Sequence, residues 1–102
     1  MARPIITTLD GKEYEMRVLT GRDWRILGEF INTAPDYADV SFLEKHATFI
    51  AKFYDGVTRD DVLNLPIEDI IPVSLAIRNY ITSQLATKLE KIEKNSETGK
   101  AQ

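Results

Sequence analysis

A long helical run near the end of the chain constrains the fold more than any other stretch. It extends from Leu65 to Lys94, and Pro66 suits its first turn, where no backbone N–H is needed. Acidic residues follow the proline and lysines end the run, as the helix dipole favours. Apolar residues recur at steps of three or four, which predicts one apolar stripe along a helix: Ile70, Val73, Ile77, Ile81, Leu85, Leu89 and Ile92.

Pro72 is the one residue in this run that opposes a helix. Its ring removes the backbone hydrogen bond to the carbonyl near Glu68. Two outcomes stay open: a kink at Pro72, or a short first helix that ends at Ile71, with the main helix starting at Pro72.

The N-terminal part of the chain has the pattern of a β-hairpin. Residues 5–9 are β-formers, and Asp10-Gly11 is a favoured pair for a tight turn. The residues from Lys12 to Val18 then alternate in polarity, with Glu13, Glu15 and Arg17 expected on the wet face and Tyr14, Met16 and Val18 on the other. A lone hairpin is marginally stable in water, so its apolar face should cover helices.

Three shorter helices are expected between the hairpin and the long run. The first spans about Gly21 to Ile31, capped by Thr20 with Asp23, and residues 32–40 read as a loop. The second follows a capping box of Ser41 and Glu44 and stops before Gly56; the third spans Arg59 to Asn64, capped by Thr58 and Asp61. The inward residues expected are Trp24, Leu27 and Ile31, then Leu43, His46, Ala47, Ile50, Phe53 and Tyr54, then Val62 and Leu65.

These elements predict an α+β fold that is mostly α: an N-terminal β-hairpin followed by a small helical bundle with a long C-terminal amphipathic helix. The chain has 102 residues, 43% of them hydrophobic, which is typical of one globular domain. We expect that domain to cover residues 1–94. Residues 95–102 are polar and contain a glycine, and we expect them to be a disordered tail.

The composition argues against catalytic and metal-binding classes of protein. There is no cysteine, the single histidine is His46, and no glycine-rich phosphate-binding motif occurs. The densest acidic cluster does not match a calcium-binding loop, and first-turn positions in helices explain most of it: Asp55, Asp60, Asp61, Glu68 and Asp69. We therefore expect no enzyme, no cofactor and no metal, with His46 as a hydrogen-bonded structural residue.

Charge and hydropathy indicate the kind of partner. Residues 26–71 carry nine acidic and three basic side chains, which disfavours nucleic acid and favours a protein partner. No apolar run is long enough to span a bilayer and no signal peptide is visible, so we expect a soluble intracellular protein.

The distal part of the long helix is the leading candidate for a partner-binding site. Val73 to Ile92 would span about 28 Å, whereas the first two helices would span about 16–21 Å. Either a surplus turn projects or the hairpin packs there, and both readings are open. The candidate residues are Leu85, Lys88, Leu89 and Ile92, with Tyr37 on the loop as a further aromatic contact. Trp24 is expected to fill the junction between hairpin and helices, although tryptophan also suits a partner-binding anchor.

Three stretches resemble a known family. They are the hairpin I-T-T-L-D-G-K-E-Y-E-M-R-V-L with the following T-G-R-D-W-R, the segment V-S-F-L-E-K-H-A-T-F-I-A-K-F-Y, and G-V-T-R-D-D-V-L-N-L-P-I-E-D-I-I-P with the long helix ending in K-L-E-K. Over residues 5–94 the chain resembles the tail assembly chaperones of long-tailed bacteriophages and related prophages. The resemblance assigns no role to any single residue.

That resemblance implies a non-enzymatic protein that binds the tape measure protein, keeps it soluble and helps the major tail protein polymerise around it. It implies action in the cytoplasm of the bacterial host and absence from the mature virion. In many such phages a frameshift adds a second segment, and K-N-S-E-T-G-K-A-Q would then be the unshifted end. Self-association stays open, as do two other functions: a small virion structural protein such as a head–tail connector, or an acidic protein-binding adaptor.

Overall fold

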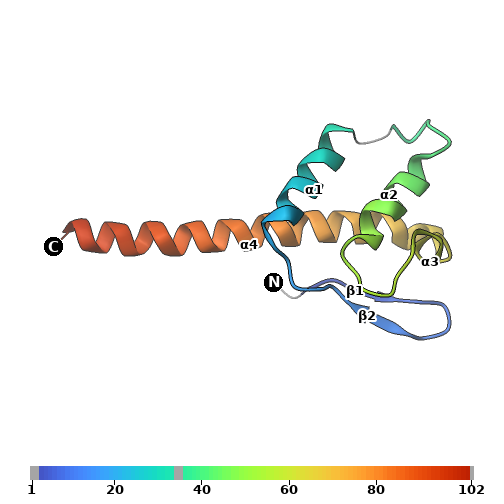
Figure 1. The fold of residues 1–102 in the computed structure, drawn as a ribbon, viewed down its shortest axis with the longest axis horizontal. Helices are drawn as coiled ribbons and strands as arrows, with labels where there is room; N and C mark the ends of the chain where they lie inside the picture. The colour runs from blue at the N-terminus through green and yellow to red at the C-terminus, as the bar shows by residue number, and fades with distance from the viewer. Residues whose placement is uncertain (1–2, 34–35, 102) are drawn as a thin grey trace.

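The fold is an antiparallel hairpin followed by four helices, which confirms the predicted α+β class with mostly α content (Figure 1). The computed structural model describes residues 3–33 and 36–101, with side chains described as far as Ala86. The elements, in order, are β1 (Ile5–Thr7), β2 (Glu13–Glu15), α1 (Gly21–Asn32), α2 (Phe42–Ala51), α3 (Arg59–Leu63) and α4 (Ile67–Ala101).

The helix α4 is continuous from Ile67 to Ala101, and Pro72 lies inside it. A separate short helix ending at Ile71 is therefore wrong. Pro72 lies near the helix start, so it removes only one backbone bond, to the carbonyl of a residue in the first turn. The helix also continues past residue 94, through residues that we expected to form a disordered tail. Residues 73–101 contain no proline and one glycine, so little in the sequence forces an end there.

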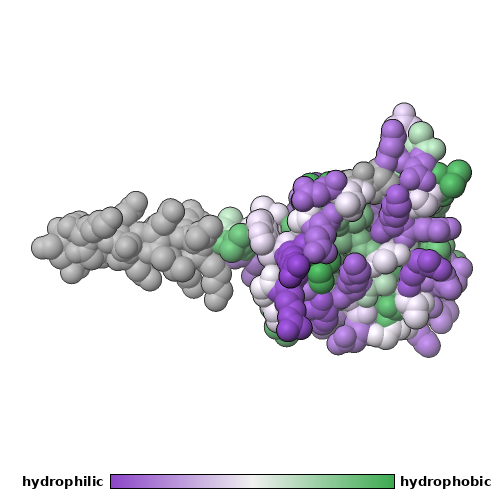
Figure 2. Space-filling model, turned by 45° about the horizontal axis from the view of Figure 1, so that its top comes forward, coloured by the Kyte–Doolittle hydropathy of each residue, from purple (hydrophilic) through white to green (hydrophobic). Residues whose placement is uncertain are grey.

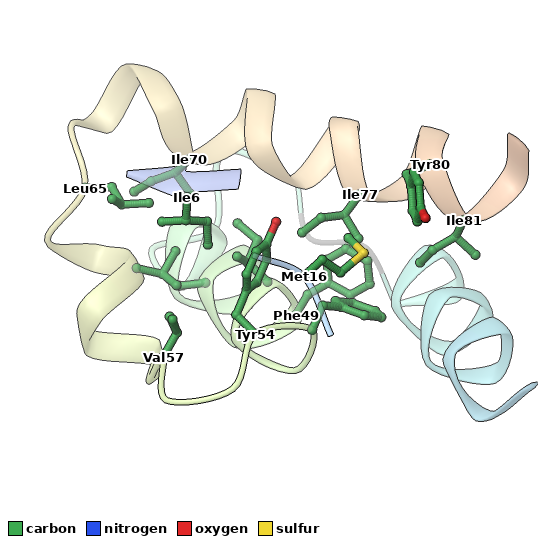
Figure 3. Close-up of a cluster of buried hydrophobic side chains, with 14 of the residues drawn as sticks. Ile6, Met16, Phe49, Tyr54, Val57, Leu65, Ile70, Ile77, Tyr80 and Ile81 are labelled. Atoms are coloured by element: carbon green, nitrogen blue, oxygen red, sulfur yellow. The ribbon is translucent and has the colours of Figure 1, made fainter. Parts of the chain in front are cut away.

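The hydrophobic core lies on one side of the N-terminal half of α4 (Figure 3). Ile77, Tyr80 and Ile81 project from α4 toward the elements beneath it, and Ile70 lies near Ile6 of the hairpin. Among the described elements, α2 makes the most extensive contact with α4, and it contributes Ala47, Phe49 and Ile50 to the core. The apolar stripe of α4 therefore packs as predicted as far as Ile81, and Val62 and Leu65 are also buried as expected.

The hairpin is shorter than predicted. Its register pairs Ile5 with Glu15, Ile6 with Tyr14 and Thr7 with Glu13, so residues 8–12 form the connection. Gly11 adopts a φ of 86°, the left-handed conformation that favours glycine at this turn. Ile6 and Met16 are buried against the helices, as an apolar hairpin face requires, whereas Val18 is exposed. The alternation fails at Val18 because strand β2 has already ended at Glu15.

Arg17, expected on the wet face, instead joins the hairpin to the helices. Its guanidinium donates two hydrogen bonds to the carboxylate of Asp23, at 2.6 and 3.0 Å. Its Nε donates to the carbonyl of Lys52, and its backbone N–H donates to the carbonyl of Phe53. Asp23 also accepts a bond from the backbone N–H of Thr20, completing the predicted capping box of α1.

Of the caps predicted for the next two helices, that of α2 is wrong and that of α3 is confirmed. At α2, Ser41 makes no side-chain cap; its hydroxyl and its backbone N–H both donate to the carboxylate of Asp39. The predicted capping box of Ser41 with Glu44 is therefore wrong. The backbone of Ser41, at φ −90° and ψ 9°, lacks the extended conformation in which an N-cap oxygen accepts from the first turn. At α3, Thr58 and Asp61 form the predicted reciprocal box.

Candidate functional site

The C-terminal half of α4 extends away from the packed body, and none of the described elements lies beside it in Figure 1. At about 1.5 Å per residue, the 35 residues of α4 span about 52 Å, close to the longest dimension of the molecule, 56 Å. The hairpin lies beneath the N-terminal half of the helix (Figure 1). The sequence left two possibilities for the distal part of the helix: it projects, or the hairpin packs against it. In the structure it projects.

Burial along the α4 stripe ends between two consecutive stripe positions. Ile81 is 5% exposed, whereas Leu85, one turn later, is 42% exposed. Lys88, Leu89 and Ile92, the other predicted contact residues on this helix, lie outside the residues whose side chains the structure describes. Leu85 thus marks the point where the apolar stripe leaves the core.

Tyr37 lies in the connection between α1 and α2 and is 85% exposed. The neighbouring backbone is organised by Asp36, whose carboxylate accepts a bond from the N–H of Ala38. In Figure 1 this connection and the C-terminal half of α4 lie at opposite ends of the molecule. The structure therefore does not bring Tyr37 together with the predicted contact residues of the helix.

Trp24 does not fill the junction between hairpin and helices, because half of its surface is exposed. The inner position in the first turn of α1 belongs to its neighbour, Asp23, held there by Arg17. This pair sets the rotation of α1, so that Leu27 is buried while Trp24 and Ile31 face outward. Sequence reasoning placed Trp24 inward because hydrophobic periodicity gives no weight to a buried ion pair.

A groove of about 690 Å³ lies between α1 and α2, and sequence reasoning missed it. Its floor includes the rings of Phe30 and Phe49, which stack with their centroids 4.1 Å apart. In Figure 2 apolar surface lies at the bottom of a hollow with hydrophilic margins on this face. The lining residues are Ile26, Glu29, Phe30, Thr33, Ser41, Glu44, Lys45, Thr48, Phe49, Lys52 and Arg59.

Both walls of this groove carry charged residues. The α2 side carries Glu44 and Lys45, Lys52 follows the end of α2, and Arg59 starts α3. Lys45 pairs with Asp39 and Arg59 pairs with Asp60. The α1 side carries Glu29, which is paired with Arg25. A sequence signal for the groove exists in hindsight: Ile26 and Phe30 lie beside the buried face of α1 and widen its apolar arc, and both are only partly buried.

His46 is a buried structural residue, as predicted from its position on α2. Its Nδ1 lies 2.9 Å from the hydroxyl oxygen of Ser74 on α4, and the rings of Phe30 and Phe42 meet it edge-on. Burial, and secondarily the charge of Arg78, lower the pKa of His46. A neutral imidazole bonded to a serine links α2 to α4.

The acidic residues occupy the positions expected of them. Asp60 and Asp61 lie in the first turn of α3, and Glu68 and Asp69 lie in the first turn of α4. Within the described residues, no group of three or more potential ligands is arranged to hold a metal ion. No helix in this part of the chain combines the length and apolar character needed to cross a membrane.

Comparisons with protein-family models, with curated proteins and with solved structures find no match to this chain.

Proposed function

We propose that this protein is a non-enzymatic tail assembly chaperone of a long-tailed bacteriophage or prophage, which binds the tape measure protein and assists tail tube assembly. One observation carries the proposal: α4 continues well beyond the body, and its apolar stripe leaves the core at Leu85. A helix that extends without a partner from a small domain offers a binding edge to another chain.

The sequence resemblance over residues 5–94 gives the proposal its particular form. A tape measure protein is expected to be very long and helical, so it exposes apolar stripes before assembly. A chaperone has to cover such stripes reversibly, and one helix against another is the simplest way. In the sequence, the apolar positions Leu85, Leu89 and Ile92 alternate with charged residues, as a helical seam with a solvated margin requires.

Co-expression tests this function. The protein should keep the tape measure protein of its own phage soluble, and the two should co-purify. Leu85→Asp combined with Leu89→Asp should weaken co-purification, while circular dichroism stays close to that of the wild type. Leu75→Asp is the matched control, because Leu75 is a half-exposed leucine of the same helix within the body.

The outcomes separate the function from its site. A wild-type protein that neither solubilises nor retains the tape measure protein contradicts the chaperone function. Detection of the protein in purified virions would favour a structural protein instead, since a chaperone leaves before the particle is complete. Equal performance of the Leu85→Asp/Leu89→Asp variant would keep the function and move the binding site elsewhere on the molecule.

A further inference from the structure

We propose that the free edge of β1 binds an extended segment of another protein, which adds a third strand to the hairpin and carries a basic residue beside Asp69. The segment would lie in a groove of about 390 Å³ between β1 and α4. This inference goes beyond the proposed function, because it uses neither the projecting half of α4 nor the tape measure protein.

The groove runs along the outer edge of β1. Four consecutive residues, Pro4 to Thr7, line it, and successive side chains of a strand point to opposite faces, so only an edge touches all four. No residue of β2 lines the groove, and in Figure 1 β1 is the strand nearer α4. The groove therefore follows the edge of β1 that β2 leaves free.

The backbone of β1 presents unpaired hydrogen-bonding groups to this edge. Thr8 donates its N–H to the carbonyl of Lys12, and the register makes Ile6 the next hydrogen-bonded position. The N–H and C=O groups of Ile6 therefore face β2, and those of Ile5 and Thr7 face outward. Within the described residues, no hydrogen bond reaches the outward groups. Their spacing matches the backbone of one more strand.

The side chains also favour pairing at this edge. β2 carries Glu13 and Glu15, and charged residues on an edge strand oppose pairing with another chain. Opposite them, β1 carries Ile5 and Thr7, which are exposed, uncharged and β-branched, as residues in strands often are. Pro4 has no N–H, so it limits new pairing to the residues that follow it. The edge of β1 is therefore the one open to a third strand.

The far wall of the groove selects a single strand. α4 lines it from Asp69 to Ala76, about 10 Å along the helix axis, and the three residues of β1 extend over about the same length. The free edge of β1 in a second copy is bordered by its own α4, so it cannot enter this groove as a bare strand. An extended segment of another protein has no such obstacle.

One charge in the groove selects a basic residue on that segment. Asp69 is exposed and is the only charged residue among those that line the groove. Within the described residues its carboxylate takes part in no ion pair. Most of the other lining residues are apolar, including Leu65 and Val73. A segment with apolar residues toward the groove and a lysine or arginine at Asp69 is therefore complementary to it.

A peptide titration of the full-length protein, followed by NMR, tests this proposal. The probe is a capped peptide of about eight residues, long enough for a strand, with alternating valine and threonine and a lysine at each end. At saturation the amide protons of Ile5 and Thr7 should shift downfield as they gain hydrogen bonds. The amide of Ile6, already bonded to β2, should shift less. The same peptide with its backbone N–H groups methylated should bind about tenfold more weakly or worse.

Two matched pairs of variants locate the site. Ile5→Pro removes an outward N–H that has no partner in the folded protein, so it should abolish the shift at Thr7, whereas Ile5→Val keeps the N–H and should bind like the wild type. At low salt Asp69→Lys should weaken binding of the lysine peptide about threefold. Glu68→Lys makes the same charge change in the same helical turn, outside the groove lining, and should weaken it less.

The possible results separate this proposal from others. Equal shifts at Ile5, Ile6 and Thr7, or full binding of the methylated peptide, would contradict strand addition. Shifts centred on Leu85 would place the peptide on the projecting half of α4. Concentration-dependent self-association that Ile5→Pro removes would assign the edge to a second copy of this chain. Peptide binding with failed co-expression supports this inference and contradicts the chaperone function alone, whereas successful co-expression without peptide binding contradicts strand addition alone.

Discussion

Asp23 is a carboxylate whose side chain is 2% exposed, in a domain of only 102 residues. Burial by itself raises the pKa of Asp23, but the hydrogen bonds from Arg17 and Thr20, with the Arg17 charge, hold the pKa below its ordinary value. Arg17 also lies over the ring of Phe53, 5.6 Å from its centroid. One ion pair therefore connects the end of the hairpin, the first turn of α1 and the end of α2.

Removing the cation should leave Asp23 buried without its partner. We expect Arg17→Met to lower the free energy of unfolding by about 3–5 kcal/mol, measured by urea denaturation. Arg25→Met removes an exposed pair with Glu29 and should cost less than about 1 kcal/mol. Similar small losses from both variants would show that the Arg17–Asp23 pair is not needed to hold α1 in place.

His46 should make stability depend on pH near neutrality. Its pKa in the folded protein lies below the ordinary value of 6.5, because burial and Arg78 disfavour the imidazolium. The unfolded chain therefore takes up the proton first, so the stabilisation is complete above pH 6.5 and is lost as the pH falls toward the folded-state pKa. Urea denaturation at pH 7.5, 6.5 and 5.5 should give a decreasing free energy of unfolding.

His46→Gln is the control for this pH dependence, because it keeps a polar side chain and removes the titration. The carboxylates lose their stabilising contribution at lower pH, since the pKa of Asp61 is below 3.8 and that of Asp39 is about 2. The slope between pH 7.5 and 5.5 should therefore disappear in His46→Gln. A slope that persists in this variant would assign the effect to another group.

Among the elements, α4 has two parts with different energetic roles. Ile81→Ala should lower the free energy of unfolding by about 2–5 kcal/mol, because it opens a cavity beneath the helix. Leu85→Ala should cost clearly less, since nearly half of that side chain already faces water. Leu89→Ala, further along the projecting half, should also cost less than Ile81→Ala. Equal large losses at all three positions would mean that the stripe is covered to its end.

The elements themselves could be predicted from the sequence because local signals agree in them. The extents of α1 and α3, the Thr20 and Thr58 caps and the stripe of α4 as far as Ile81 follow from periodicity and capping. The inner face of α1 could not, because it depends on the ion pair between Arg17 and Asp23, which no periodicity encodes. The Ser41 cap failed because the backbone of Ser41 is not extended, and both its hydroxyl and its N–H turn back to Asp39.

For the molecule as a whole, one of the two candidate sites was indicated by the sequence and the other was not. Helix lengths indicated a projecting half of α4 as one of two open readings, by comparing the stripe with the helices available to cover it. The groove was not indicated, because it exists only once α1 and α2 are placed side by side with Phe30 against Phe49. A concave surface between two elements depends on their separation and rotation, and the order of residues gives neither.

Residues 95–102 should contribute little to the stability of the whole. The end of α4 lies far from the packed body in Figure 1, and deleting these residues removes no described core contact. We expect the melting temperature of the deletion variant to stay within about 4 °C of the wild type, a shift worth near 1 kcal/mol for a domain of this size. A larger drop, measured by calorimetry, would show that the segment packs.

The extended helix also determines how the protein moves through solution. The Cα radius of gyration is 16.4 Å, whereas a compact chain of this length would have about 13 Å. Friction grows with such elongation, so on gel filtration a monomer of 11.6 kDa should elute at the position of a heavier sphere. Light scattering, which reports mass without reference to shape, should return the monomer value for the same peak.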